Sequence, residues 1–101
     1  MKLVIVTAVS EFRDTVKKLF YASGIENFSG SEITGFSKSA SANTRTGWFQ
    51  GSSSGASSDM YFSFTEGDKI AQLFQQIETF NQALETNNPI RAVVIPIEEF
   101  I

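Results

Sequence analysis

The chain has 101 residues, a formal net charge of −3 and a hydrophobic fraction of 42%, and it contains neither Cys nor His. Because Cys and His are absent, disulfides, the usual zinc sites and Ser-His-Asp or Cys-His catalysis are excluded. The acidic balance also argues against nucleic acid as a partner, since phosphate backbones attract basic proteins. The length suits one core, so we expect residues 1–101 to form a single domain.

No part of the sequence reaches the roughly 18 consecutive apolar residues that a transmembrane helix needs. The N-terminal sequence MKLVIVTAV contains a short apolar run but lacks the small-residue cleavage site of a signal peptide. We therefore expect a cytoplasmic protein that does not insert directly into a membrane.

The first half of the chain predicts a strand, a helix and a second strand. Residues 3–9 are rich in β-branched side chains, which is typical of a strand in the middle of a sheet. Ser10 is the predicted N-cap of the following helix, and Gly24 is its predicted C-terminal stop. Apolar side chains at helical spacing form the predicted buried stripe of this helix: Phe12, Val16, Leu19 and Phe20. Residues 27–36 alternate partially and predict a strand with one exposed face.

The second half predicts a strand, a longer helix and a last strand. Residues 60–65 are rich in aromatic side chains and predict the third strand. The next helix has an apolar stripe with helical period: Ile70, Leu73, Phe74, Ile77, Phe80 and Leu84. Asn87-Asn88-Pro89 ends this helix, because a residue before proline is pushed out of the helical region. Residues 90–97 predict the last strand, and Pro96 places part of it at an edge or outside the sheet.

The predicted order β-α-β-β-α-β is that of the ferredoxin-like α+β fold. This fold has a four-stranded antiparallel sheet with both helices on one face, and here a long loop joins its second and third strands. The other face of the sheet would carry several aromatic and β-branched side chains. Because an exposed apolar face usually marks a partner, we expect the chain to self-associate.

Residues 37–59 form the predicted long loop, with the sequence SKSASANTRTGWFQGSSSGASSD. Loops within compact domains have a median length of about 4–6 residues, so this segment predicts either a functional loop or a flexible linker. Arg45, Trp48 and Phe49 lie near its middle, and Arg and Trp are enriched at binding hot spots. We therefore predict that these three residues contact a partner protein. The alternative is that Trp48 and Phe49 pack on their own subunit.

The segment Gly24-Ile25 and the later run Ser31-Glu32-Ile33-Thr34-Gly35-Phe36-Ser37-Lys38 resemble a segment of the nitrogen-regulatory PII proteins and their PII-like relatives. The element order and the long insertion directly after Phe36 fit the same resemblance. In that family the insertion is the T-loop, which binds partner proteins. The family's proteins are trimers, and a nucleotide lies between neighbouring subunits. The resemblance implies a trimeric regulatory or adaptor protein whose loop engages a partner such as a membrane transporter. A small ligand such as an adenine nucleotide would control it.

The resemblance also implies which residues would line the cleft between subunits. The first strand, the base of the loop and the start of the last strand supply them: Thr7, Gly35, Phe36, Ser37, Lys38 and Arg91. Gly35 would let a ligand approach the backbone, and Lys38 and Arg91 would oppose phosphate charge. Glu32, on the second strand, is predicted to form a structural salt bridge. No catalytic or metal-binding constellation is evident in the sequence, so we predict a protein that is not an enzyme.

Two departures from the family pattern leave other functions open. Asn87-Asn88-Pro89-Ile90 stands where nucleotide-binding members have a Gly-rich turn, and residues 97–101 (IEEFI) are acidic where those members are basic. One alternative is therefore a homo-oligomeric structural module with no ligand in the cleft. A minor alternative is an RNA-binding domain, because residues 61–64 (YFSF) faintly resemble the base-stacking strand of RNA-recognition domains.

Overall fold

The computed structural model describes residues 1–36, 57–84 and 87–101. In chain order its elements are β1 (Lys2–Val9), the short 3-10 helix η1 (Ser10–Phe12), α1 (Arg13–Ala22), β2 (Ser29–Thr34), β3 (Ser57–Thr65), α2 (Gly67–Leu84) and β4 (Arg91–Pro96). The predicted order of strands and helices is confirmed, although β2 and β4 are shorter than predicted. Of the helices in these ranges, none has the length and hydropathy needed to cross a bilayer.

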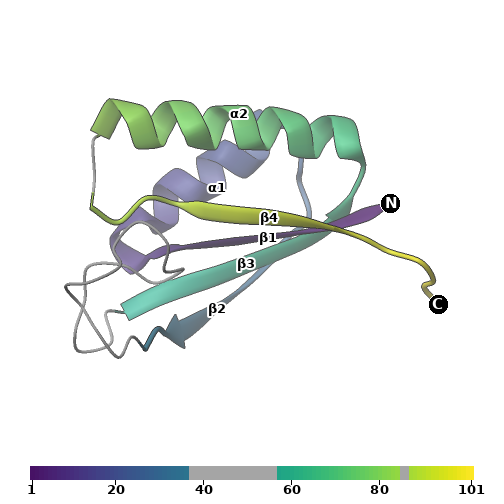
Figure 1. Cartoon of the computed structure of the whole chain (residues 1–101), viewed down its shortest axis with the longest axis horizontal. Helices are drawn as coiled ribbons and strands as arrows, with labels where there is room; N and C mark the ends of the chain where they lie inside the picture. Colours follow the sequence, from purple (N-terminus) through teal and green to yellow (C-terminus); the bar gives the residue numbers. More distant parts are fainter. Residues whose placement is uncertain (37–56, 85–86) are drawn as a thin grey trace.

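The four strands form one antiparallel sheet in the order β2-β3-β1-β4. β1 pairs with β3 on one side and with β4 on the other, so the apolar run of residues 3–9 is central, as predicted. β2 and β4 are the outer strands, and Pro96 ends β4 at an edge, where proline is tolerated. Both helices cover the same face of the sheet (Figure 1). The predicted ferredoxin-like α+β fold is confirmed.

The core lies between the helices and the sheet face that they cover. Alternate residues of a strand point to opposite faces, and Val4 and Val6 of β1 are fully buried beneath the helices. The helices contribute buried side chains at helical spacing: Val16 and Phe20 from α1, and Ile70, Leu73 and Ile77 from α2. Both predicted stripes are thereby confirmed except at Leu84, which is 49% exposed at the last residue of α2.

The start of the first helix differs from the prediction. Ser10 lies in the 3-10 helix η1, and α1 begins at Arg13. Ser10 is not an N-cap, because its hydroxyl contacts side chains of β3 instead of helix N–H groups. It donates to Asp59 Oδ1 at 3.2 Å and shares a hydrogen bond of 3.0 Å with Ser57 Oγ. These contacts with β3 take the place of the predicted hydrogen bond between the Ser10 hydroxyl and the backbone of the helix.

The predicted stop of the first helix at Gly24 is confirmed. Gly24 has a φ of 82°, which L side chains rarely adopt. The N–H of Gly24 donates to the carbonyl of Tyr21 at 3.0 Å, and the N–H of Ile25 donates to the carbonyl of Phe20 at 2.9 Å. These two bonds form a Schellman motif, which satisfies the last carbonyls of α1 and turns the chain toward β2.

The predicted loop 37–59 is too long at its C-terminal end. β3 begins at Ser57, so residues 57–59 belong to the sheet. Asp59 pairs with Ala8 of β1 on one side and with Glu32 of β2 on the other. Asp is uncommon in strands, but the pairing of β3 with a strand on each side outweighs that preference. The sheet therefore holds Asp59 in a fixed position.

Candidate functional site

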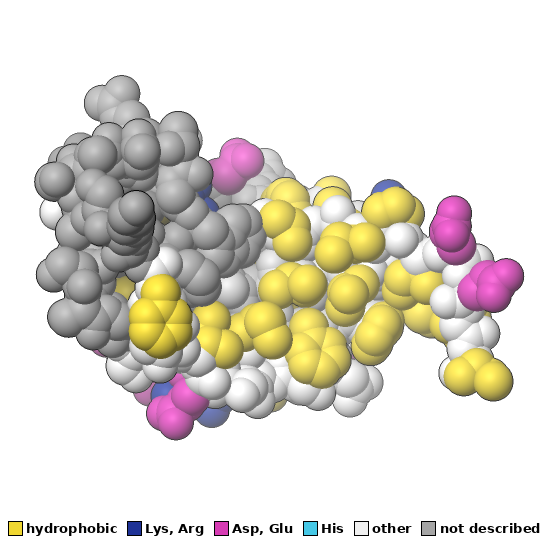
Figure 2. All heavy atoms as spheres, turned by 60° about the horizontal axis from the view of Figure 1, so that its bottom comes forward, with side chains coloured by type: hydrophobic (Ala, Val, Ile, Leu, Met, Phe, Trp, Pro, Cys, Tyr) yellow, Lys and Arg dark blue, Asp and Glu magenta, His cyan; other side chains and the backbone are white. Residues whose placement is uncertain are grey.

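The sheet face turned away from α1 and α2, here called the open face, is largely apolar. Residues directly opposite in an antiparallel pair share a face, so the register identifies its members. Its apolar members come from all four strands: Leu3, Ile5, Val9, Ile33, Met60, Phe62, Phe64, Val93 and Ile95. Figure 2 shows hydrophobic side chains gathered into a continuous patch over the sheet. Phe64 is 57% exposed and Ile95 is 42% exposed, so the open face presents large apolar side chains to solvent.

Two of the predicted cleft residues lie side by side on the open face. Thr7 of β1 is directly opposite Arg91 of β4. Thr7 is buried, and within the described ranges Arg91 Nε is a buried side-chain nitrogen with no hydrogen-bond partner. A buried donor without an acceptor is costly in a folded protein. Arg91 Nε is therefore a hydrogen-bond donor that the described part of this chain leaves unused.

The remaining predicted site residues are only partly within the described ranges. Gly35 is buried directly after β2, and Phe36 beside it is 82% exposed. The end of β2 lies level with the end of β1, because Ile33 and Val9 both pair with Ser58. The sheet thus places Gly35 at the same end as Thr7 and Arg91. The other predicted residues lie outside the described residues: Ser37, Lys38, Arg45, Trp48 and Phe49.

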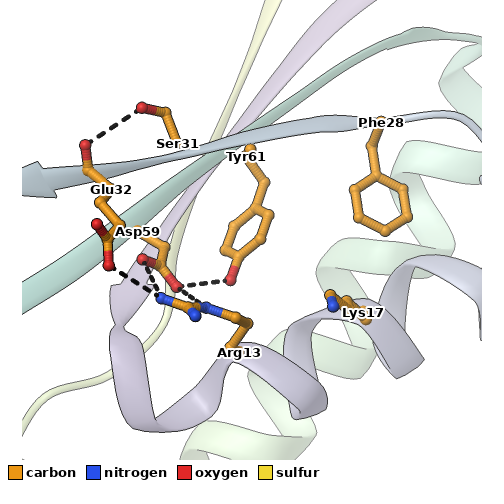
Figure 3. Close-up of a pocket in the computed structure, with 8 residues that line it drawn as sticks. Arg13, Lys17, Phe28, Ser31, Glu32, Asp59 and Tyr61 are labelled. Atoms are coloured by element: carbon orange, nitrogen blue, oxygen red, sulfur yellow. Dashed lines mark hydrogen bonds and ion pairs between the residues drawn. The ribbon is translucent and has the colours of Figure 1, made fainter.

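A second polar site lies on the helix-covered side of the sheet, around Asp59 (Figure 3). Arg13 of α1 donates from Nε to Asp59 Oδ2 at 2.8 Å and from Nη2 to Asp59 Oδ1 at 3.1 Å. Tyr61 donates its hydroxyl to Asp59 Oδ2 at 3.0 Å, and Ser10 donates to Oδ1. Arg13 Nη2 also lies 3.5 Å from Glu32 Oε1. The predicted salt bridge of Glu32 is therefore present, with Arg13 as its partner.

Burial and charge shift the protonation of this cluster. The pKa of the Asp59 carboxyl is lowered, chiefly by its hydrogen bonds from Arg13, although burial acts in the opposite direction. The pKa of Tyr61 is raised to about 12, first by burial and then by its hydrogen bond to the Asp59 carboxylate. The same carboxylate raises the pKa of Arg13. At neutral pH the cluster is an ionised Arg-Asp pair with a protonated Tyr.

A cavity of about 350 Å³ opens beside this cluster, between α1 and the strands β2 and β3. Its floor and rim are formed by eight residues: Arg13, Lys17, Phe28, Gly30, Ser31, Glu32, Asp59 and Tyr61. The Tyr61 ring lies against the backbone of its cross-strand partner Gly30. A Cβ at position 30 would lie 3.0 Å from Tyr61 Cδ1 and 3.2 Å from Cε1, so glycine is what admits the ring here.

This second site was not predicted, although the sequence contains weak signals for it. Arg13 and Lys17 are four residues apart and so share one face of α1. Extending the alternation of the third strand backward by one step would have put Asp59 on the same face as Tyr61. The Ser-rich run before Asp59 suggested a loop instead. Within the described ranges, no three His, Cys, Asp or Glu side chains form a group suited to a metal ion.

No protein family model matches the sequence, and no curated protein matches it significantly. Among solved structures, the chain is similar to a DUF3240 family protein from Shewanella baltica OS155. The TM-score is 0.64 at 16% sequence identity, and the match covers 98% of this chain and 91% of that one. At this identity the likeness shows a shared fold alone.

Proposed function

We propose that this chain is a PII-like regulatory or adaptor protein that assembles into a homotrimer through the open face of its sheet. The observation that carries the proposal is the continuous apolar surface of that face (Figure 2). Patches of this kind on a small protein are typical of protein interfaces. A second copy is a fitting occupant, because the patch is formed by a regular sheet that another sheet can match.

A small ligand in the cleft between subunits would regulate the assembly. Support for a ligand comes from Arg91, whose buried Nε has no hydrogen-bond partner in the described part of the chain. Thr7 and Gly35 lie at the same end of the sheet. A phosphate oxygen of an adenine nucleotide is an acceptor that would satisfy such a donor. The alternative is a homo-oligomeric module in which Arg91 is satisfied by the neighbouring subunit.

Residues 37–56 would then engage the partner protein, for which a membrane transporter is our proposal. This part of the proposal rests on the sequence, where Arg45, Trp48 and Phe49 combine the residue types of binding hot spots. Affinity purification from the native membrane fraction tests it. Replacing Trp48 and Phe49 by Ala is expected to abolish recovery of the transporter, whereas Gln50→Ala is expected to retain it.

Sedimentation at micromolar concentration tests the assembly. We expect a trimer for the native chain and a monomer for the double variant Phe64→Lys/Ile95→Lys, which places two charges on the open face. Tyr21→Lys is the matched control, because Tyr21 is an aromatic residue of α1 with the same 57% exposure as Phe64. A stable native monomer would overturn the proposal, and a dimer would retain the interface but refute the trimer.

Calorimetric titration with ATP, ADP, AMP and cyclic dinucleotides tests the ligand. Micromolar binding of any of them, weakened at least about tenfold by Arg91→Gln and unchanged by Lys69→Gln on α2, is the expected result. No heat across the whole panel would favour the structural module instead. Because the two experiments are independent, the assembly can be confirmed while the nucleotide is refuted.

A further inference from the structure

We propose that the cavity between α1 and β2-β3 is a binding site for a small organic anion with an aromatic or apolar body. This cavity lies on the helix-covered side of the sheet, away from the open face, so the inference is independent of the proposed function. Its volume of about 350 Å³ is at the lower end of the range for small-molecule sites, and suits a molecule with one ring.

The walls of the cavity are already fixed by contacts within the chain. Both oxygens of Asp59 accept two hydrogen bonds each: Oδ1 from Ser10 and Arg13, and Oδ2 from Arg13 and Tyr61. Asp59 is 3% exposed and Tyr61 is 4% exposed. A site whose side chains are held in this way loses little conformational entropy when a ligand binds.

One charged side chain in the described lining of the cavity is free to pair with an anion. Four ionised side chains line it: Arg13, Lys17, Glu32 and Asp59. The Asp59 carboxylate is saturated by its four donors, and the Glu32 carboxylate is paired with Arg13 at 3.5 Å on the exposed rim. Among the described residues, no carboxylate lies within ion-pair distance of Lys17 Nζ. The four charges sum to zero. Because Arg13 is shared between two carboxylates, Lys17 is the cation of the cavity that has no ion-pair partner among the described residues. Its ammonium group is therefore free to pair with the carboxylate of a ligand.

The apolar part of the cavity favours a ring. Phe28 and Tyr61 line it with their rings 6.4 Å apart and steeply inclined at 66°. Phe28 is itself held by stacking on the buried ring of Phe20, at 4.4 Å and 15°. Figure 3 shows Lys17 on α1 below Phe28, on the same side of the cavity as Arg13. A ligand with its ring near Phe28 could therefore direct a carboxylate to Lys17.

Binding of four matched probes, followed by amide chemical shifts, tests the inference. The probes are 3-phenylpropionate, its neutral amide, 3-phenylpropylamine and phenylalanine, which differ in charge around the same ring. We expect 3-phenylpropionate to shift the amides of residues lining the cavity and to bind about five- to tenfold more tightly than the amide. Lys17→Met is expected to remove this preference, since it retains the apolar stem but not the charge.

Lys18→Met is the matched control, because Lys18 is the next residue of α1, is also exposed and does not line the cavity. It is expected to leave the preference unchanged. Four results would overturn the inference: no binding of any probe, equal binding of the anion and the amide, tighter binding of the amine or of phenylalanine, or equal loss in Lys17→Met and Lys18→Met.

Discussion

Asp59 of β3 and Arg13 of α1 form a two-point ion pair across 46 residues of sequence, with contacts of 2.8 and 3.1 Å. The Asp59 side chain is 4% exposed and that of Arg13 is 45% exposed, so the carboxylate is the buried member. The pair connects the first turn of α1 to β3. It also sets one wall of the cavity beside Lys17.

Replacing Asp59 by Asn is expected to destabilise the protein by about 2 kcal/mol at pH 7, because hydrogen bonds to a charged group are lost. Chemical denaturation of both proteins measures the difference. Asp14→Asn is the control, since Asp14 is an exposed residue of α1 next to Arg13 and, among the described residues, takes no part in the hydrogen bonds or ion pairs of the cluster. Equal losses of unfolding free energy in the two variants would show that the Arg13–Asp59 pair stabilises the fold no more than an exposed carboxylate does.

The same pair predicts how stability depends on acid. The pKa of Asp59 is lowered by folding, so its contribution is complete above the unfolded-state value of 3.8 and is lost as the pH falls through the folded value. Denaturation curves of the native chain and of Asp59→Asn should therefore converge as the pH falls from about 5 to about 2. A difference in unfolding free energy between the two proteins that stays constant across this pH range would contradict a lowered pKa for Asp59.

Tyr61 predicts a matching dependence on base. Its folded-state pKa of about 12 exceeds the ordinary tyrosine value of 10.0, so the protonated form stabilises the fold. This contribution is complete below pH 10 and is lost as the pH rises from 10 to about 12. Tyrosinate absorbance should show a late component near pH 12 that is missing in Tyr61→Phe. Identical titration curves for the two proteins, apart from amplitude, would exclude a raised pKa.

Gly30→Ala tests the packing of Tyr61 against the sheet. A Cβ at 3.0 Å from the ring must displace it or bend β2, which we expect to cost about 1–2 kcal/mol. Gly67→Ala is the control, because its Cβ would meet the flexible side chain of Lys2 at 3.7 Å. It should be neutral or slightly stabilising. Thermal unfolding of both variants shows whether the loss of stability in Gly30→Ala comes from the close contact with Tyr61 or from the replacement of a glycine as such.

Gly24→Ala tests the end of α1. With φ at 82°, an Ala at this position is strained, and we expect a loss of about 1 kcal/mol. Gly24→Asn should lose less, because Asn tolerates the left-handed region better than other residues. Denaturation midpoints of the two variants give the comparison. An Ala variant at least as stable as the Asn variant would contradict the left-handed backbone conformation of Gly24.

Much of the fold could be predicted because its signals are local. The apolar spacing of α1 and α2 and the β-branched run of β1 depend on residues only a few positions apart. The errors fell where a distant segment decides the outcome. Ser10 has the chemistry of an N-cap, yet Asp59 and Ser57 on β3 compete for its hydroxyl. Residues 57–59 have the composition of a loop, yet β1 and β2 pair with them on both sides.

The sequence by itself determined the order of the elements, the antiparallel sheet with its helices on one side, and an open face rich in aromatic side chains. These follow from periodicity, since a stripe of apolar residues must be buried wherever its helix or strand is placed. The tertiary structure alone decided that Arg13, Asp59 and Tyr61 form one cluster, and that Thr7 lies opposite Arg91. Strand register and helix position set those contacts, and both are fixed by the whole core and not by any one segment.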